Sequence, residues 1–175
     1  GNITMIPNED AYLIRGKGGS WNQWYKVSLP NMDTTLFLDK NCFNHKGNNL
    51  FVEKLILSED GKMALLKTDI KRLWRYSNIG TYFIIEIKSK VLMPLTQNNT
   101  ELRNVKFSPN SNFIAYVRND NNLYAYDIKR GKEKKLTITG SKTILNGHFG
   151  WLYEEELTGY DGYRWSPDSK SIAYW

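Results

Sequence analysis

Short runs of apolar and aromatic residues alternate along this chain with clusters of Pro, Asn, Asp and Gly. Runs such as T-Y-F-I-I-E-I (81–87), L-Y-A-Y-D-I (123–128) and K-L-T-I-T (135–139) are typical of β-strands. No helical periodicity extends beyond about two turns, and no apolar run approaches the roughly 18 residues of a membrane-spanning helix. The aromatic share of 14% also favours strands. The pattern therefore predicts an all-β fold.

A repeat of strands and turns recurs along the sequence. L-S-E-D-G-K-M-A-L-L begins at Leu57, F-S-P-N-S-N-F-I-A-Y at Phe107 and W-S-P-D-S-K-S-I-A-Y at Trp165, with a fainter copy, I-P-N-E-D-A-Y-L-I, at Ile6. Repeats of about 40 to 50 residues that hold several short strands are typical of β-propeller blades. We expect about three to three and a half four-stranded blades, a partial β-propeller. Residues 1–175 would then be a fragment of a larger propeller.

The third interval of the repeat is longer than the second. Ser58 and Ser108 are 50 residues apart, whereas Ser108 and Ser166 are 58 apart, which indicates an insertion of about eight residues. The segment W-L-Y-E-E-E-L, Trp151 to Leu157, falls in this interval. Its three adjacent carboxylates repel one another, and partial burial would make their charge more unfavourable. Such a cluster indicates a binding site for a cation.

The geometry of the three glutamates depends on the local backbone. On a strand, Glu154 and Glu156 would share a face and Glu155 would oppose them. In a helical turn, adjacent side chains diverge by about 100° and can converge on one small ligand. The segment has good helix formers and no β-branched residue, which favours a short helical insert. The residues alone leave an equal alternative, an exposed acidic turn that balances nearby lysines.

The net charge is +6, and the densest basic run is K-R-G-K-E-K-K, residues 129–135. This run could contact phosphates, but no aromatic side chains alternate with its lysines as a strand-binding surface requires. We favour a solvated hairpin turn centred on Gly131 and expect no nucleic-acid partner. Cys42, the one cysteine, is expected to be a free buried thiol. His45 and His148 are expected in loops.

Catalytic machinery is absent from the sequence. There is no G-x-S-x-G elbow and no Ser, Asp and His in the order and context of a hydrolase triad. We therefore expect no catalytic residue, no metal site and no cofactor in this chain.

Two segments resemble a known family. N-G-H-F-G-W-L-Y-E-E-E-L (146–157), followed by Y-R-W-S-P-D-S-K-S-I-A-Y-W (163–175), is similar to the glutamate motif and the next blade of the dipeptidyl peptidase IV family. A-L-L-K-T-D-I-K-R-L-W-R-Y-S (64–77) ends in the W-R-x-S element that carries the substrate-binding arginine of these serine peptidases of the prolyl oligopeptidase clan. The order and the approximate spacing fit over essentially the whole chain. We expect a bacterial member of the family.

The resemblance implies residue roles. Glu155 and Glu156 would bind the free α-ammonium of a peptide, and Arg75 would bind the carbonyl of the penultimate substrate position. Glu154, Tyr153 and Trp151 would support them. Family members often have Asp before the motif Trp, where this chain has Gly150, so a local hydrogen bond is expected to be missing or supplied differently.

The resemblance also implies an architecture and an activity. An eight-bladed propeller would cap an α/β-hydrolase domain that lies outside this chain and packs on the propeller. The parent would be a secreted, periplasmic or cell-envelope enzyme, and a homodimer. It would release N-terminal dipeptides, with Pro or Ala second, from peptides with a free N-terminus. The fragment alone would be inactive.

Two other functions stay open. A catalytically inactive relative could use the propeller as a scaffold for protein–protein interaction, or the chain could be a propeller binding module unrelated to peptidases. Sequons at Asn2 and Asn98 would be glycosylated only in a eukaryotic secreted protein.

Overall fold

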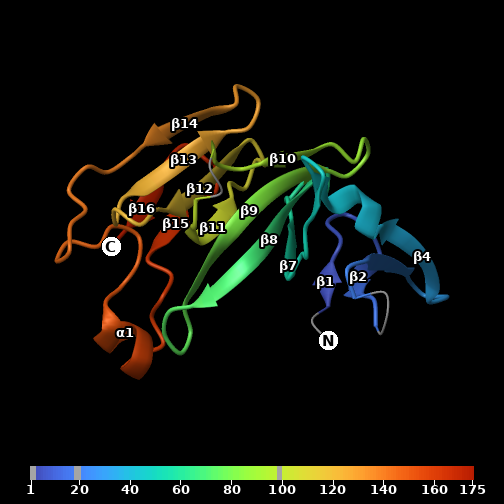
Figure 1. Ribbon diagram of the computed structural model, residues 1–175, viewed down its shortest axis with the longest axis horizontal. Coiled ribbons are helices and arrows are strands. Elements are labelled where there is room, and N and C mark those ends of the chain that lie inside the picture. Colours follow the sequence, from blue (N-terminus) through green and yellow to red (C-terminus); the bar gives the residue numbers. More distant parts are fainter. Residues whose placement is uncertain (1–2, 18–20, 98–99) are drawn as a thin grey trace. The chain divides into compact units, whose positions relative to one another are not determined.

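The computed structural model describes residues 3–17, 21–97 and 100–175 (Figure 1). The sequons at Asn2 and Asn98 lie outside these residues. In the described part, three antiparallel four-stranded sheets follow one another along the chain, each formed by strands that are consecutive in sequence, and a two-stranded sheet comes last. This architecture confirms the predicted partial propeller of about three and a half blades.

The elements have the following bounds. The first sheet contains β1 (Thr4–Met5), β2 (Ala11–Arg15), β3 (Trp24–Ser28) and β4 (Asp33–Leu38). The second contains β7 (Lys54–Leu57), β8 (Met63–Arg72), β9 (Asn78–Glu86) and β10 (Leu92–Pro94). The third contains β11 (Arg103–Phe107), β12 (Phe113–Val117), β13 (Leu123–Asp127) and β14 (Lys132–Lys135), and the last β15 (Tyr163–Trp165) and β16 (Ile172–Tyr174). A 3-10 helix, η2 (Lys40–Phe43), a small hairpin of β5 (Asn44–His45) and β6 (Asn48–Asn49), and the helix α1 (Trp151–Glu156) complete the list.

Three of the four repeated turns predicted from the sequence share one hydrogen-bond pattern. The Ser108 hydroxyl lies 2.8 Å from an Asn110 carboxamide oxygen and accepts from the backbone N–H of Phe113 at 3.0 Å. The same bonds recur from Ser58 to Asp60 and Met63, and from Ser166 to Asp168 and Ser171. Side chains of Ser, Asn and Asp stabilise turns by bonding to nearby backbone in this way. In these three repeats the turn therefore leads directly into the second strand.

The chain forms two compact units, each with its own core. One comprises residues 1–69 and 82–95, and the other residues 70–81 and 96–175. In the first unit, Leu13, Leu38, Phe43 and Leu66 are among the buried core residues. In the second, Ala115, Val117, Leu123 and Tyr163 form a buried cluster. The tip of the β8–β9 hairpin, the third sheet and α1 all belong to the second unit, which therefore holds every predicted site residue.

Several local predictions can be compared with the structure. β13 and β14 pair as an antiparallel hairpin, and Gly131 in its turn has φ +62°, which confirms the predicted turn. The second strand of the hairpin is Lys132–Lys135, so the strand expected over 135–139 is wrong. Cys42 is a free thiol, which confirms one part of its prediction, but it is only partly buried, so the expectation of a buried thiol is wrong. It sits in the short η2 helix, whose buried side chain is that of Phe43. Over the described residues, no helix has the length and apolar character that crossing a membrane requires.

Candidate functional site

The helix α1 is short and weakly capped. It extends from Trp151 to Glu156, and Gly150 at its N-cap provides no side-chain hydrogen bond. The absence of this bond agrees with the expectation, drawn from Gly at position 150, that a local hydrogen bond is missing or supplied differently. A helix of six residues is not stable by itself, because few backbone bonds offset the cost of nucleation. Contacts with the rest of the unit must therefore hold α1.

The two ends of the insert that carries α1 meet. Gly162 N–H donates to the carbonyl oxygen of Gly147 at 3.2 Å, and Trp175 N–H donates to the carbonyl oxygen of Gly162 at 2.9 Å. The insert is thus a loop closed between Gly147 and Gly162, and β15 follows it directly. This loop lies in the longer third interval of the repeat.

Arg75 lies at the tip of the β8–β9 hairpin. The tip is closed by the N–H of Leu73, which donates to the carbonyl oxygen of Ser77 at 3.0 Å. The Arg72 guanidinium donates to the carbonyl oxygens of Trp74 and Arg75 at 3.0 and 3.1 Å. These bonds fix the backbone that presents the Arg75 side chain to solvent.

The hairpin tip and α1 meet at Arg75 and Glu155. The backbone N–H of Arg75 donates to Glu155 Oε1 at 2.5 Å, and Arg75 Nε lies 3.2 Å from Glu155 Oε2. The Arg75 side chain is 60% exposed, whereas that of Glu155 is 15% exposed. Two predicted substrate-binding residues, 80 positions apart in the sequence, are therefore in direct contact.

Glu154 is fully buried beneath this pair. One of its carboxylate oxygens accepts a hydrogen bond from the Ser77 hydroxyl, and the other lies 3.4 Å from Arg103 Nη1. Burial raises the pKa of Glu154, and the neighbouring charge of Glu155 raises it further, while Ser77 and Arg103 oppose the shift. Glu154 thus ties α1 both to the hairpin that carries Arg75 and to β11.

His148 extends the buried network. Its Nδ1 contacts Arg103 Nη1, and its Nε2 lies 2.9 Å from Asn121 Oδ1. Because a guanidinium can only donate, Nδ1 accepts and the proton sits on Nε2. Desolvation, together with the charge of Arg103, lowers the pKa of His148 to about 4. His148 is in a loop, as predicted, but it is buried and neutral within the described network.

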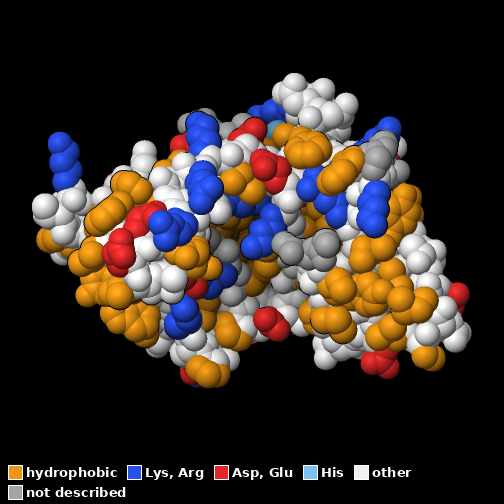
Figure 2. Space-filling model, turned by 90° about the horizontal axis from the view of Figure 1, so that it is seen from below, with side chains coloured by type: hydrophobic (Ala, Val, Ile, Leu, Met, Phe, Trp, Pro, Cys, Tyr) orange, Lys and Arg blue, Asp and Glu red, His pale blue; other side chains and the backbone are white. Residues whose placement is uncertain are grey.

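The remaining predicted residues are exposed. Glu156, Trp151 and Tyr153 lie on the solvent side of α1, and Tyr153 stacks on Phe149 with ring centroids 5.3 Å apart. Glu156 makes no hydrogen bond or ion pair in the part of the chain that the structure describes. In the space-filling view, hydrophobic side chains gather around acidic and basic ones where α1 forms the surface (Figure 2, left). The structure therefore brings Glu155 to Arg75 and leaves Glu156 exposed on α1.

A pocket of about 530 Å³ adjoins the buried network. Among its lining residues are Trp74, Arg103, His148 and Trp151. Sequence reasoning missed Arg103, Ser77 as a partner of Glu154, and the buried role of His148. Ser77 carries a signal, since it completes the W-R-x-S element. Arg103 carries none, because nothing in L-R-N-V-K-F points to a glutamate 51 positions later.

Comparison with known proteins connects this geometry to a family. Residues 58–175 match the family described as the dipeptidyl peptidase IV (DPP IV) N-terminal region. Dipeptidyl aminopeptidase B of Saccharomyces cerevisiae is 36% identical over 142 residues, which are 80% of this chain and 17% of that protein. Dipeptidyl peptidase 4 of Trichophyton rubrum is 38% identical over 117 residues, 66% of this chain and 15% of that protein.

Solved structures agree on the fold. The crystal structure of Porphyromonas gingivalis dipeptidyl peptidase 4 matches 95% of this chain and 24% of its own, with a TM-score of 0.85 and 21% identity. The tricorn protease matches less closely, with a TM-score of 0.57 and 14% identity over 98% of this chain and 14% of its own. This chain therefore spans no more than about a quarter of the relatives quoted. On the family match and these identities, the chain belongs to the dipeptidyl peptidase IV family, to its N-terminal region.

Proposed function

We propose that this chain is the substrate-binding propeller segment of a serine-type dipeptidyl peptidase. Glu155 and Glu156 bind the α-ammonium of a peptide, and Arg75 binds the carbonyl of its penultimate residue. The observation that carries the proposal is the direct contact of Arg75 with Glu155, held in place by the buried Glu154. The quoted relatives are named dipeptidyl aminopeptidase B and dipeptidyl peptidase 4, which supports peptides as substrates.

The charges suit this role. An α-amino group has a pKa near 8, so at neutral pH most of it is cationic. Glu155 is only partly exposed and already has one cationic neighbour, while the exposed Glu156 can complete a pair of acceptors around an ammonium ion. Arg75 contacts Glu155 through Nε, and its exposed planar group of donors can also bind a carbonyl.

Fixing the amino end of a peptide sets which bond is cleaved. If the ammonium is bound at a fixed distance from the nucleophile, only the bond after the second residue reaches it, and such positioning contributes to rate as well as affinity. A blocked amino terminus would leave the carboxylates without their partner, so acetylated peptides would be rejected. The same proposal includes a hydrolase domain packed on the propeller and a preference for Pro or Ala at the second position. It also includes a homodimeric parent of bacterial origin with a secreted, periplasmic or envelope location.

The test uses the complete peptidase with Glu155→Gln and Glu156→Gln together. Two charge-assisted hydrogen bonds of about 1.5–3 kcal/mol each predict a fall in kcat/KM of roughly 100-fold or more toward alanyl-proline p-nitroanilide. Glu59→Gln, an exposed acid in a blade turn, is the matched control and should keep normal activity. Arg75→Ala should have a milder effect.

Near-normal turnover by the double variant would refute the ammonium-binding role. If the complete protein lacks activity toward any dipeptidyl substrate, the alternative of a non-catalytic scaffold for protein–protein interaction takes its place. A larger effect of Arg75→Ala than of the double change would reverse the ranking of these sites.

A further inference from the structure

The position of α1 depends on how the two ends of its insert are held. Gly147 and Gly162 are in backbone contact, and a Cβ atom added to Gly162 would lie 2.7 Å from the carbonyl carbon of Gly147. Glu155 is carried by the loop between these ends. Whatever fixes the ends therefore fixes the direction from which Glu155 meets Arg75.

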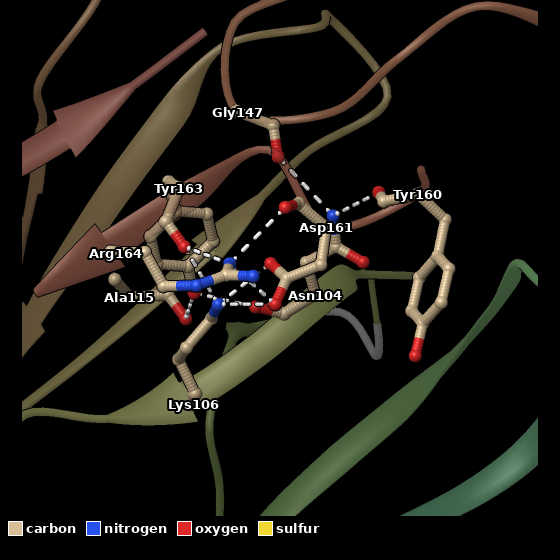
Figure 3. Close-up of polar contacts among 8 residues, drawn as sticks. All are labelled: Asn104, Lys106, Ala115, Gly147, Tyr160, Asp161, Tyr163 and Arg164. Carbon is tan, nitrogen blue, oxygen red and sulfur yellow. Dashed lines mark hydrogen bonds and ion pairs between the residues drawn. The ribbon is translucent and has the colours of Figure 1, made fainter. Parts of the chain in front are cut away.

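Asn104 in β11 binds both sides of the insert (Figure 3). Its Nδ2 amide donates to the carbonyl oxygen of Gly147 at 3.2 Å and to that of Tyr160 at 2.9 Å. Gly147 precedes α1 and Tyr160 follows it. A single side chain thus connects the entry of the insert to its exit.

The backbone of Asn104 is held in an uncommon conformation. Its φ is +54°, and the pairing of β11 with β12 shifts register between Arg103 and Lys106. The hydroxyl of the fully buried Tyr163 lies 2.5 Å from the carbonyl oxygen of Asn104 and 2.8 Å from that of Ala115. A β-bulge re-aims side chains, and a left-handed residue other than Gly persists where its surroundings impose it.

The irregularity lets one strand contact the insert at three places. In a regular strand, residues 103 and 104 would point to opposite faces. Here Arg103 lies 3.4 Å from Glu154. Figure 3 shows the other two contacts: Asn104 binds both ends of the insert, and Lys106 Nζ binds the two carboxylate oxygens of Asp161 at 2.6 and 2.8 Å. β11 therefore holds the insert in place, and of these three residues Asn104 is the one that contacts both of its ends.

We propose that Asn104 is a positioning residue for the ammonium site. Through its two amide bonds it sets the place of α1, and so the place of Glu155 relative to Arg75. This inference rests on the proposed function of that site. Displacements of about 1 Å in a positioning group can cost about 100-fold in rate, so an indirect contact of this kind has a measurable effect.

The test is Asn104→Gly in the complete peptidase. Glycine adopts positive φ readily, so the bulge is kept while the amide is lost. The matched control is Asn8→Gly, because Asn8 is an exposed asparagine with φ +60° in the β1–β2 turn. At a temperature well below both thermal midpoints, we expect Asn104→Gly to raise KM and to lower kcat/KM for alanyl-proline p-nitroanilide at least about tenfold relative to the control.

A second variant separates loss of the Asn104 amide from a general loosening of the β11 backbone. Asn104→Asp keeps a short side chain tolerant of positive φ but turns a carboxylate toward two carbonyl oxygens. It should impair kcat/KM more than Asn104→Gly does. Unchanged kcat/KM in both variants overturns the inference, and so does an equal loss in Asn8→Gly.

The outcome is distinguishable from failure of the proposed function. If both Asn104 variants are normal while Glu155→Gln with Glu156→Gln abolishes activity, the ammonium site stands and the role of Asn104 falls. If the double glutamine variant is active, both fall.

Discussion

Glu154 provides the sharpest test of how α1 is held. Its side chain is fully buried, accepts a bond from Ser77 and faces Arg103 at 3.4 Å. Glu154→Ala would leave the Arg103 side chain, itself only 10% exposed, without its carboxylate. The Ser77 hydroxyl would lose its acceptor as well. The change therefore acts on the link between α1, the hairpin tip and β11.

The expected magnitude follows from the burial of the pair. Removing one partner of a buried ion pair costs about 3–5 kcal/mol, because the other charge stays buried without compensation. The lower end applies here, since Arg103 also contacts His148 and is not completely enclosed. About 3 kcal/mol corresponds to roughly a 150-fold change in the opening equilibrium of the insert.

Hydrogen exchange measures this opening directly. The N–H groups of Glu154, Leu157 and Gly159 donate to carbonyl oxygens of α1 and its cap, and their exchange reports local unfolding. Mass spectrometry of peptides that cover 148–160 should show exchange about 150-fold faster in Glu154→Ala, or exchange at the rate of an unstructured chain if the insert opens more easily than that. Glu156→Ala is the matched control, because Glu156 is exposed and surface substitutions stay within about 0.5 kcal/mol.

Exchange in Glu154→Ala within about threefold of that in Glu156→Ala would refute the reasoning. A second arm adds Arg103→Ala to Glu154→Ala. The double variant should recover part of the protection, because it leaves no uncompensated charge. Simple addition of two losses would show that the two charges are not coupled.

Two further predictions concern the same insert. Gly162→Ala would place a Cβ atom 2.7 Å from backbone atoms of Gly147 and His148, so it should lower the free energy of unfolding by about 1–3 kcal/mol. Gly159→Ala is the control, because its Cβ atom would have no neighbour nearer than 3.7 Å, and equal thermal midpoints for the two variants would contradict the close approach at Gly162. The pKa of His148 is lowered to about 4 in the folded protein, against about 6.5 in the unfolded chain. As the pH falls, the unfolded state therefore binds a proton first, and the free energy of unfolding decreases from about pH 6.5 down to about pH 4. His148→Gln removes this contribution, and the difference in unfolding free energy between wild type and variant should change by about 2 kcal/mol between pH 7 and pH 5; a constant difference would mean that His148 is not held neutral.

Turn chemistry and strand patterns are the part of this protein that the sequence alone determines. Ser108 and its counterparts bond to groups two and five residues away, so a short window of sequence contains the whole interaction. The strand runs at 81–87 and 123–128 and the hairpin turn at Gly131 are also set by nearby residues. The sequence favours the short helix, since W-L-Y-E-E-E contains good helix formers, but contacts with the rest of the unit hold it.

The tertiary structure alone decided which groups meet. Three identical neighbouring glutamates differ in burial: Glu154 is buried, Glu155 is largely buried against Arg75, and Glu156 is exposed. The partners of Glu154 are Ser77 and Arg103, 77 and 51 positions earlier, and the partner of Glu155 is Arg75, 80 positions earlier. Such contacts depend on sheet register and on the bulge at Asn104, which no local propensity encodes. A sequence specifies nearby bonds residue by residue, whereas the burial of a charge is fixed only when distant strands have packed around it.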